Sequence, residues 1–172
     1  MKIYLAGPDV FRADAQAHGE RLKQLCARHG FEGLFPLDTP APRGAGKEAA
    51  DAIYRANLQL LDGADIVMAN LAPFRGHEPD SGTAFEVGYA AARGKQVWAY
   101  TEDGRELIQR VATHVGPDGS PADDHGFRVE DFGLSVNLML ACSVTLVHGG
   151  AEDCLRSIAA AQPATPLSTE TA

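Results

Sequence analysis

Short runs of apolar residues alternate along this chain with longer segments in which apolar side chains recur every three or four positions. Short apolar runs are typical of strands buried in a sheet, and the longer spacing is typical of helices with one buried face. We expect strands at 2–6, 31–35, 65–71, 96–101 and 143–147, and helices at 11–29, 48–61, 81–93, 134–141 and 151–161, with a helical turn within 106–114. Segments 36–47 and 116–131 are rich in Gly and Pro and are predicted to be loops.

Five strands that alternate with helices predict a single-domain α/β fold over residues 1–161, followed by a flexible tail at 162–172. Right-handed crossovers place helices on both faces of a parallel sheet, which gives three layers and the flavodoxin-like strand order 2-1-3-4-5. Ligands of such sheets bind beyond the carboxyl ends of the strands, where the strand order reverses. The loop at 7–11 after the first strand is therefore expected beside the loop at 73–80 after the third.

The composition limits the classes of partner. The 172 residues carry a net charge of −8 without a cluster of Lys and Arg, which argues against a nucleic-acid polymer or an anionic membrane. No apolar run reaches membrane-spanning length, and the sequence opens directly on the first expected strand, so we expect a cytoplasmic protein. Cys26, Cys142 and Cys154 lack the spacing of a metal site, and neither a metal nor another cofactor is expected.

Two carboxylates lie where the third strand passes through a loop into a helix. Glu86 stands among apolar residues in the first two turns of this helix, where an unpaired carboxylate is costly to bury. Asp80 lies at the start of the same helix. Each has a structural explanation, since Asp80 before Ser-Gly-Thr is a good N-cap and Glu86 could pair with a backbone group or an arginine. Together, a nucleophilic carboxylate and an acid/base carboxylate are the groups that break a glycosidic bond with retention.

Five sequence motifs resemble those of the nucleoside 2-deoxyribosyltransferases. They are Tyr-Leu-Ala-Gly-Pro-Asp-Val-Phe at 4–11, Ala-Asp-Ile-Val-Met-Ala-Asn-Leu at 64–71, Pro-Phe-Arg-Gly at 73–76, Asp-Ser-Gly-Thr-Ala-Phe-Glu-Val-Gly at 80–88 and Asn-Leu-Met at 137–139. The element Asp-x-Gly-Thr-x-x-Glu-x-Gly is the most specific of them. The resemblance spans most of residues 1–147.

The resemblance implies a ping-pong transfer of the 2-deoxyribosyl group between the nucleobases of 2′-deoxynucleosides, as in nucleotide salvage. Glu86 would attack C1′ and carry a covalent sugar ester, Asp80 would help to protonate the departing base, and Tyr4 would orient Glu86. Asn137 and Met139 match residues that reach into a neighbouring subunit's pocket, so a homo-oligomer, at least a dimer, is implied. The substrate-binding residues implied for 2′-deoxynucleosides and free nucleobases are Gly7, Phe11, Asp65, Pro73, Phe74, Arg75, Gly82, Asn137 and Met139.

The sequence also bears on functions other than 2-deoxyribosyl transfer. The loop at 7–11 lacks Gly-x-Gly-x-x-Gly and the chain lacks the Walker Gly-Lys-Ser/Thr, which argues against a dinucleotide or ATP enzyme. A hydrolase of 2′-deoxynucleoside 5′-monophosphates would use the same Glu86 and would need phosphate donors, for which Arg75, Ser81 and Ser143 are the candidates. A non-catalytic nucleoside-binding sensor would not need Glu86. A flavin-binding protein would need a Ser/Thr-rich loop after the first strand, which is missing here.

Overall fold

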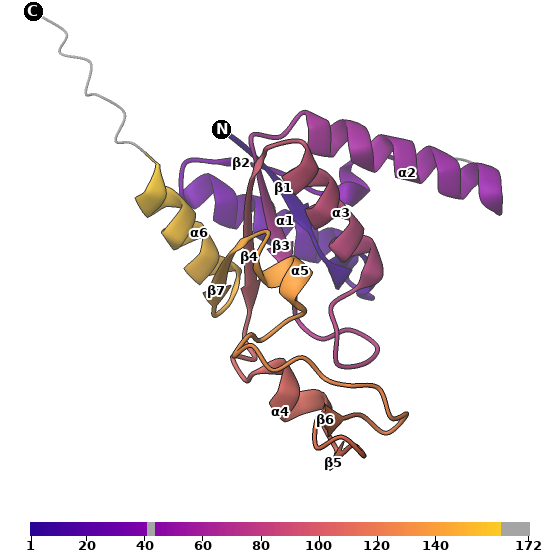
Figure 1. Ribbon diagram of the computed structural model, residues 1–172. Helices are drawn as coiled ribbons and strands as arrows, with labels where there is room; N and C mark the ends of the chain where they lie inside the picture. Colours follow the sequence, from indigo (N-terminus) through magenta and orange to yellow (C-terminus); the bar gives the residue numbers. More distant parts are fainter. Residues whose placement is uncertain (41–43, 163–172) are drawn as a thin grey trace, which may run out of the picture.

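A parallel five-stranded sheet forms the centre of the molecule in this computed structural model, which describes residues 1–40 and 44–162 (Figure 1). In spatial order its strands are β2 (Glu32–Leu34), β1 (Lys2–Ala6), β3 (Ile66–Asn70), β4 (Gln96–Thr101) and β7 (Thr145–His148). Every neighbouring pair is parallel. This arrangement confirms the flavodoxin-like order predicted from the sequence, with β7 as the fifth strand of the sheet.

Helices cover both faces of this sheet. The core of one face includes residues of α1 (Ala15–Arg28) and α6 (Ala151–Ala161). The core of the other face includes residues of α2 (Lys47–Asp62), α3 (Ser81–Ala92) and α5 (Leu138–Ala141). Side chains alternate between the faces along β1, as the pleat of a strand requires, so Ile3 lies in the first core and Tyr4 in the second. This alternation turns Tyr4 toward the face that α3 covers.

Two predicted helices differ from the structure. The helix expected at 11–29 is divided, because Pro8 opens a 3-10 helix over Pro8–Phe11 (η1) and the chain is extended at Arg12 before α1 begins. The helix expected at 134–141 is reduced to α5. Its first residues are held elsewhere, because the carbonyl of Leu134 accepts a hydrogen bond from the N–H of Leu107, the first residue of α4 (Leu107–Val111).

The long loop predicted at 116–131 contains part of a small hairpin that the sequence analysis missed. Strand β5 (His114–Val115) pairs in antiparallel fashion with β6 (Pro121–Ala122). Gly119 has a φ of 83°, a conformation in which a side chain is strained, and its N–H donates to the carbonyl of Gly116 to close the turn. The predicted loop at 36–47 also holds a short 3-10 helix, Pro36–Asp38 (η2). Both pieces are too short to give a periodic apolar pattern.

No helix within residues 1–40 and 44–162 is both long enough and apolar enough to cross a membrane. The predicted tail falls outside the described residues from position 163 onward. The remaining elements agree with the predicted ones to within a few residues at each end.

Candidate active site

Tyr4 and Glu86 form a direct pair at the centre of the candidate site. Tyr4 is fully buried in β1, and its hydroxyl donates a hydrogen bond of 2.6 Å to Glu86 Oε1 in the second turn of α3. Burial raises the pKa of the Glu86 carboxyl to about 7, the hydrogen bond from Tyr4 opposes the rise, and the negative charge of Asp80 adds to it. Burial and the charge of Glu86 raise the pKa of Tyr4 far above its ordinary value, so the phenol remains a donor.

Asp80 is the N-cap of α3 and also faces the candidate site. Its Oδ2 accepts hydrogen bonds from Thr83 N at 2.9 Å and from Thr83 Oγ1 at 3.1 Å, which is the capping arrangement that the sequence suggested. A Cβ at Gly82 would lie 3.0 Å from Asp80 Oδ2, so a residue without a side chain leaves room for this carboxylate. Asp80 is more than a helix cap, because it also lines the cavity that contains Glu86.

The cavity in front of these carboxylates has a volume of about 320 Å³, within the range of small-molecule sites. Apart from its two carboxylates its wall is mainly apolar, and it comes from β1–η1, η2, α2 and α3. Its lining residues are Gly7, Val10, Phe11, Pro36, Leu37, Ile53, Asn57, Asp80, Gly82, Thr83 and Glu86. A wall of this kind suits a ring that is held by contact, with a few polar groups at the reacting end.

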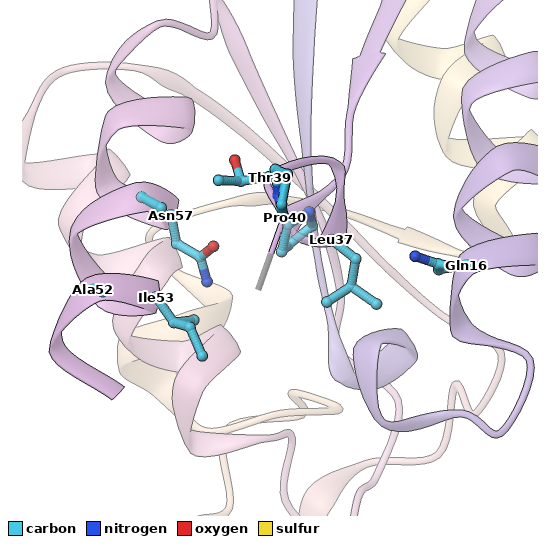
Figure 2. Close-up of a pocket in the computed structure, with 9 residues that line it drawn as sticks. Gln16, Leu37, Thr39, Pro40, Ala52, Ile53 and Asn57 are labelled. Carbon is cyan, nitrogen blue, oxygen red and sulfur yellow. The ribbon is translucent and has the colours of Figure 1, made fainter. Parts of the chain in front are cut away.

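A second cavity of about 290 Å³ shares part of this wall (Figure 2). Leu37, Ile53 and Asn57 line both cavities, so the two spaces adjoin between η2 and α2. Figure 2 shows Ile53 and Asn57 on α2 facing the same space as Leu37. The wall of the candidate site therefore extends outward from Glu86 along α2.

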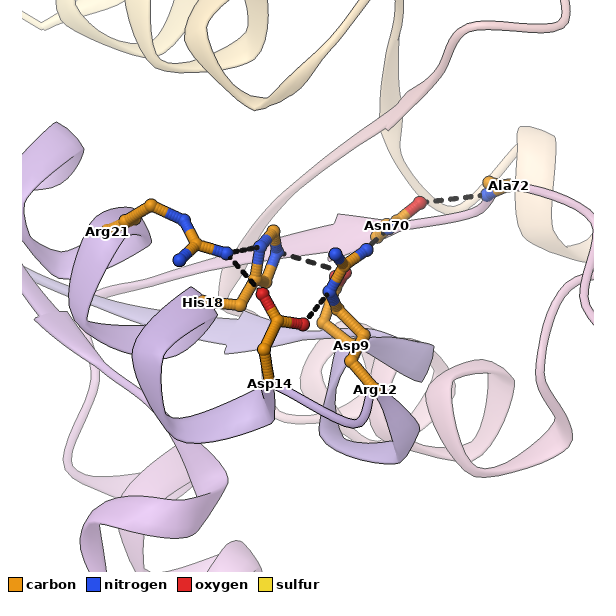
Figure 3. Close-up of polar contacts among 7 residues, drawn as sticks. All are labelled: Asp9, Arg12, Asp14, His18, Arg21, Asn70 and Ala72. Carbon is orange, nitrogen blue, oxygen red and sulfur yellow. Dashed lines mark hydrogen bonds and ion pairs between the residues drawn. The ribbon is translucent and has the colours of Figure 1, made fainter.

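A polar network around buried Asp9 holds the loop that follows β1 (Figure 3). Asp9 is 9% exposed, and its Oδ1 lies 3.1 Å from His18 Nε2 while its Oδ2 accepts a bond of 3.0 Å from Asn70 Nδ2. Asn70 Oδ1 in turn accepts from the N–H of Ala72 at 3.0 Å. These bonds tie the loop after β1 to the loop after β3. A Cβ at Gly7 would lie 2.9 Å from the Cβ of Asn70, so the two loops approach closely only because position 7 is glycine.

Aromatic side chains from the same two loops stack on each other. The rings of Phe11 and Phe74 are 5.3 Å apart and nearly parallel, and the guanidinium of Arg75 lies 4.6 Å from the Phe74 centroid and 5.0 Å from that of Phe11. Arg75 has a φ of 54°, so its backbone is held in a conformation that non-glycine residues rarely adopt. The structure thus brings the loops at 7–11 and 73–80 together, as the strand order predicts.

Six of the substrate-binding residues proposed from the sequence do not line this cavity: Asp65, Pro73, Phe74, Arg75, Asn137 and Met139. Asp65 precedes β3 at the amino edge of the sheet, where its Oδ2 accepts from the N–H of Lys2 at 2.7 Å, so it lies at the edge opposite the carboxyl ends of the strands. Asn137 caps α5 and Met139 is 72% exposed, and neither lines the cavity that holds Glu86. Of the remaining three, Phe74 and Arg75 join the aromatic stack beside the cavity, and Pro73 lines a separate cavity with Asn70 and Tyr100.

Asp9, His18 and Asn70 were not predicted from the sequence as parts of the site. Asp9 was noticed only as part of a motif, and the signal that marks Asn70 is a polar residue at the carboxyl end of an otherwise buried strand. His18 carries no such signal, because its partner Asp9 belongs to another element, and the contact between them depends on how α1 packs against η1.

Comparisons with known proteins show which family this chain is similar to. A sequence model of the family described as nucleoside 2-deoxyribosyltransferase matches residues 3–139. An uncharacterised protein of Schizosaccharomyces pombe is 32% identical over 155 residues, which cover 80% of this chain and 74% of that protein. Among solved structures, a 2-deoxyribosyltransferase from Leishmania mexicana is 32% identical with a TM-score of 0.76, over 94% of this chain and 99% of the other.

Two further solved structures share the fold at lower identity. A conserved protein from Enterococcus faecalis has a TM-score of 0.61 at 23% identity, over 92% of this chain and 96% of that one. A 2-deoxyribosyltransferase from Bacillus psychrosaccharolyticus has a TM-score of 0.52 at 23% identity, over 66% of this chain and 84% of that one. The family match covers the strands, the loops and the helix that build the candidate site, and the chain therefore belongs to the nucleoside 2-deoxyribosyltransferase family.

Proposed function

We propose that this protein transfers the 2-deoxyribosyl group from one nucleobase to another, with Glu86 as the nucleophile. The observation that carries the proposal is the hydrogen bond of 2.6 Å from Tyr4 to Glu86, in an apolar cavity that Asp80 also lines. A carboxylate with a pKa raised to about 7 is a better nucleophile than an ordinary glutamate, and about half of it is ionised at neutral pH. The structurally similar protein of Leishmania mexicana carries the name of this activity.

In the first half-reaction, a carboxylate oxygen of Glu86 forms a bond to C1′ as the bond from C1′ to the base nitrogen breaks. The electron pair of that bond leaves with the base, and the base takes up a proton from solvent that Asp80 relays. The product is a 2-deoxyribosyl ester of Glu86. Because Tyr4 holds Oε1, the carboxylate has one fixed orientation toward the substrate, and little entropy remains to be lost when it attacks.

In the second half-reaction, an incoming base gives up a proton through Asp80 to solvent, and its nitrogen attacks C1′ as the ester bond breaks. Two inversions at C1′ give net retention. Transfer rather than hydrolysis requires that a base reaches the ester before water does. The stack of Phe11, Phe74 and Arg75 beside the cavity offers aromatic surface on which a base is held while water is displaced.

A second copy of the chain is part of this proposal. Asn137 and Met139 lie outside the cavity of their own chain, and 72% of the surface of Met139 is exposed. We therefore propose that each chain supplies these residues to the cavity of a partner, as the family resemblance implies. The proposed ligands are 2′-deoxynucleosides and free nucleobases, and the chemistry uses neither a metal nor another cofactor.

The deciding experiment is intact-protein mass spectrometry after mixing with 2′-deoxyinosine, with and without adenine. A deoxyribosyl-sized increase in mass that disappears when adenine is added, with deoxyadenosine as product, supports the transferase. The Glu86→Ala variant is the control and shows no increase. Free hypoxanthine without deoxyadenosine would indicate a hydrolase, and 2′-deoxyinosine 5′-monophosphate is tested in parallel for that case. Binding without turnover of any of these compounds would indicate a nucleoside sensor.

A further inference from the structure

Arg110 is a buried cation that the proposed chemistry does not use. It lies in α4, beyond the carboxyl end of β4 (Figure 1), and its side chain is only 4% exposed. Burying a guanidinium is costly unless its N–H groups and its charge are compensated. The contacts of Arg110 therefore show which groups compensate the cost of burying its charge.

The guanidinium of Arg110 donates to two backbone carbonyls from different segments. Nη1 donates to the carbonyl of His77 at 2.8 Å, and Nη2 donates to the carbonyl of Ser135. Its nearest carboxylate, Asp103 Oδ2, is 4.0 Å from Nε, and Nε has no hydrogen-bond partner within the described residues. The two Nη atoms of the guanidinium thus bond to backbone carbonyls rather than to a carboxylate. This arrangement connects two loops through one side chain.

The two carbonyls belong to segments that lead into candidate functional residues. His77 precedes Asp80 by three positions, and Ser135 precedes Asn137 by two. A further bond joins the same parts, because the N–H of Leu107 at the start of α4 donates to the carbonyl of Leu134 at 2.7 Å. Helix α4 therefore lies between the loop at 73–80 and the segment at 134–137 and is bonded to both.

The positive charge of Arg110 also acts on a carboxylate of the loop at 73–80. Desolvation raises the pKa of Glu78, the positive charge of Arg110 opposes the rise, and Glu130 adds to it. Glu130 holds the second segment, since its Oε1 accepts from Asn137 Nδ2 at 2.5 Å and its Oε2 accepts from the N–H of Leu138 at 2.9 Å. Arg110 thus contributes a favourable charge beside Glu78 as well as two hydrogen bonds.

We propose that Arg110 is a positioning residue that clamps the loop at 73–80 to the segment at 134–137, and so holds Asp80 and Asn137 in their places. The clamp itself is independent of the reaction. Its consequence for catalysis rests on the function proposed above, because only a transferase would use Asp80 and Asn137 as described. The two parts are tested by different measurements.

The clamp is tested by hydrogen exchange followed by mass spectrometry on the whole protein. Arg110→Met should exchange at least about threefold faster in peptides covering 73–80 and 129–138, with β1, β3 and β4 unchanged. The control is Arg105→Met, because Arg105 lies in the same region, is 65% exposed and, among the residues that the structure describes, pairs with Asp103 alone, and it should leave both segments unchanged. Faster exchange in one segment alone, or in neither, would overturn the clamp whatever the enzyme does.

A conservative variant covers the case in which Arg110→Met does not fold. Arg110→Lys keeps the positive charge and removes the planar fork that reaches two carbonyls. It should speed exchange in at least one of the two segments. Unchanged protection in both would mean that charge alone suffices, and the proposal of a two-carbonyl clamp would be wrong.

The catalytic consequence is read from rates normalised to the fraction of chains that form the Glu86 ester. Arg110→Met should lower the normalised kcat about tenfold with a KM change below about twofold, and raise the ratio of hydrolysis to transfer. A purely structural role would lower the active fraction and leave these normalised values unchanged. If the wild-type protein shows no transfer at all, the proposed function fails, while the exchange measurement still decides the clamp.

Discussion

Tyr4 Oη and Glu86 Oε1 are joined by a hydrogen bond of 2.6 Å, although the two residues are 82 positions apart in the sequence. The strand order brings them together. β1 lies beside β3, α3 follows β3 along the chain, and α3 packs on the face of the sheet toward which Tyr4 points. A residue of β1 therefore orients the proposed nucleophile, Glu86. Packing of α3 on the sheet buries Glu86.

Replacing Tyr4 by Phe should slow formation of the Glu86 ester about 10- to 100-fold, because a hydrogen bond to a charged group is worth about 1.5–3 kcal/mol. The loss of the donor should also raise the pKa of Glu86 further, since the bond from Tyr4 opposes that rise. Rapid-quench mass spectrometry over a range of pH measures both effects. Tyr89→Phe is the matched control, because the hydroxyl of Tyr89 bonds to exposed Asp62 away from the cavity. Equal ester rates in the two variants would contradict the role of Tyr4.

The raised pKa of Glu86 predicts how activity depends on pH. The nucleophile is the ionised carboxylate, so the rate of ester formation should rise with pH and level off above about 7. A rate that is independent of pH between about 5 and 8 would contradict an ionised Glu86 as the attacking group. The measurement uses pre-steady-state ester formation, since product release could hide this dependence in steady-state rates.

The raised pKa of Glu86 also predicts how the free energy of unfolding depends on pH. The folded-state pKa of Glu86, about 7, lies above its ordinary value of 4.5, so between these values the native state binds more protons than the unfolded state. The contribution of Glu86 to the free energy of unfolding should therefore decrease as pH rises from about 4.5 to 7, by at most about 3 kcal/mol. Glu86→Gln removes this contribution. In urea unfolding, the free energy of unfolding of the variant should therefore rise relative to that of the wild-type protein as pH increases over that range. A constant difference between the two would argue against the shift.

The sequence predicts the fold more completely than it predicts the candidate site. The alternation of apolar strands and amphipathic helices sufficed for the sheet order, because crossover handedness leaves few alternatives. The apolar setting of Glu86 indicated burial, and its helix lies where the strand order puts a site. Asp65 shows the limit of a motif match, since the direction of β3 puts that residue at the opposite edge of the sheet.

The parts that could not be predicted depend on contacts between distant segments. The pairing of Asp9 with His18 and Asn70 joins three elements, and the apolar pattern within each element gives no sign of the partner in another. The same holds for Arg110, whose acceptors are backbone carbonyls and so leave no trace in the identity of the residues that carry them. Local patterns determine which helices and strands form, whereas such polar connections appear only when the elements have packed.

Asp80→Asn should separate the chemical role of Asp80 from its capping role. The amide oxygen of Asn can still accept from Thr83 N, so the free energy of unfolding should change by less than about 1 kcal/mol. Loss of the negative charge should lower the pKa of Glu86 and shift the acidic limb of ester formation to lower pH. Base departure should slow at the same time, as measured by release of hypoxanthine in a single turnover. A change confined to KM would count against the acid/base role.

Asp9→Ala should destabilise the protein by about 1–3 kcal/mol, because it leaves the polar groups of His18 and Asn70 without their buried partner. Urea unfolding measures this change. Asp14→Ala is the control, since Asp14 is an exposed carboxylate that pairs with Arg12 and Arg21 at the surface, and its loss should cost less than about 1 kcal/mol. Equal losses in the two variants would mean that the Asp9 network contributes no more than a surface ion pair.

The proposed sharing of Asn137 between chains is tested by mixing two inactive variants. Glu86→Ala chains keep Asn137, and Asn137→Ala chains keep Glu86. If each cavity takes its Asn137 from the partner in a two-fold dimer, a mixed dimer has one complete site. An equal mixture after subunit exchange should then recover about a quarter of the wild-type activity, because half of the dimers are mixed and each has one working site of two. Native mass spectrometry confirms that mixed dimers have formed. Mixed dimers without recovered activity would mean that Asn137 serves its own chain or none, and the shared site would be excluded.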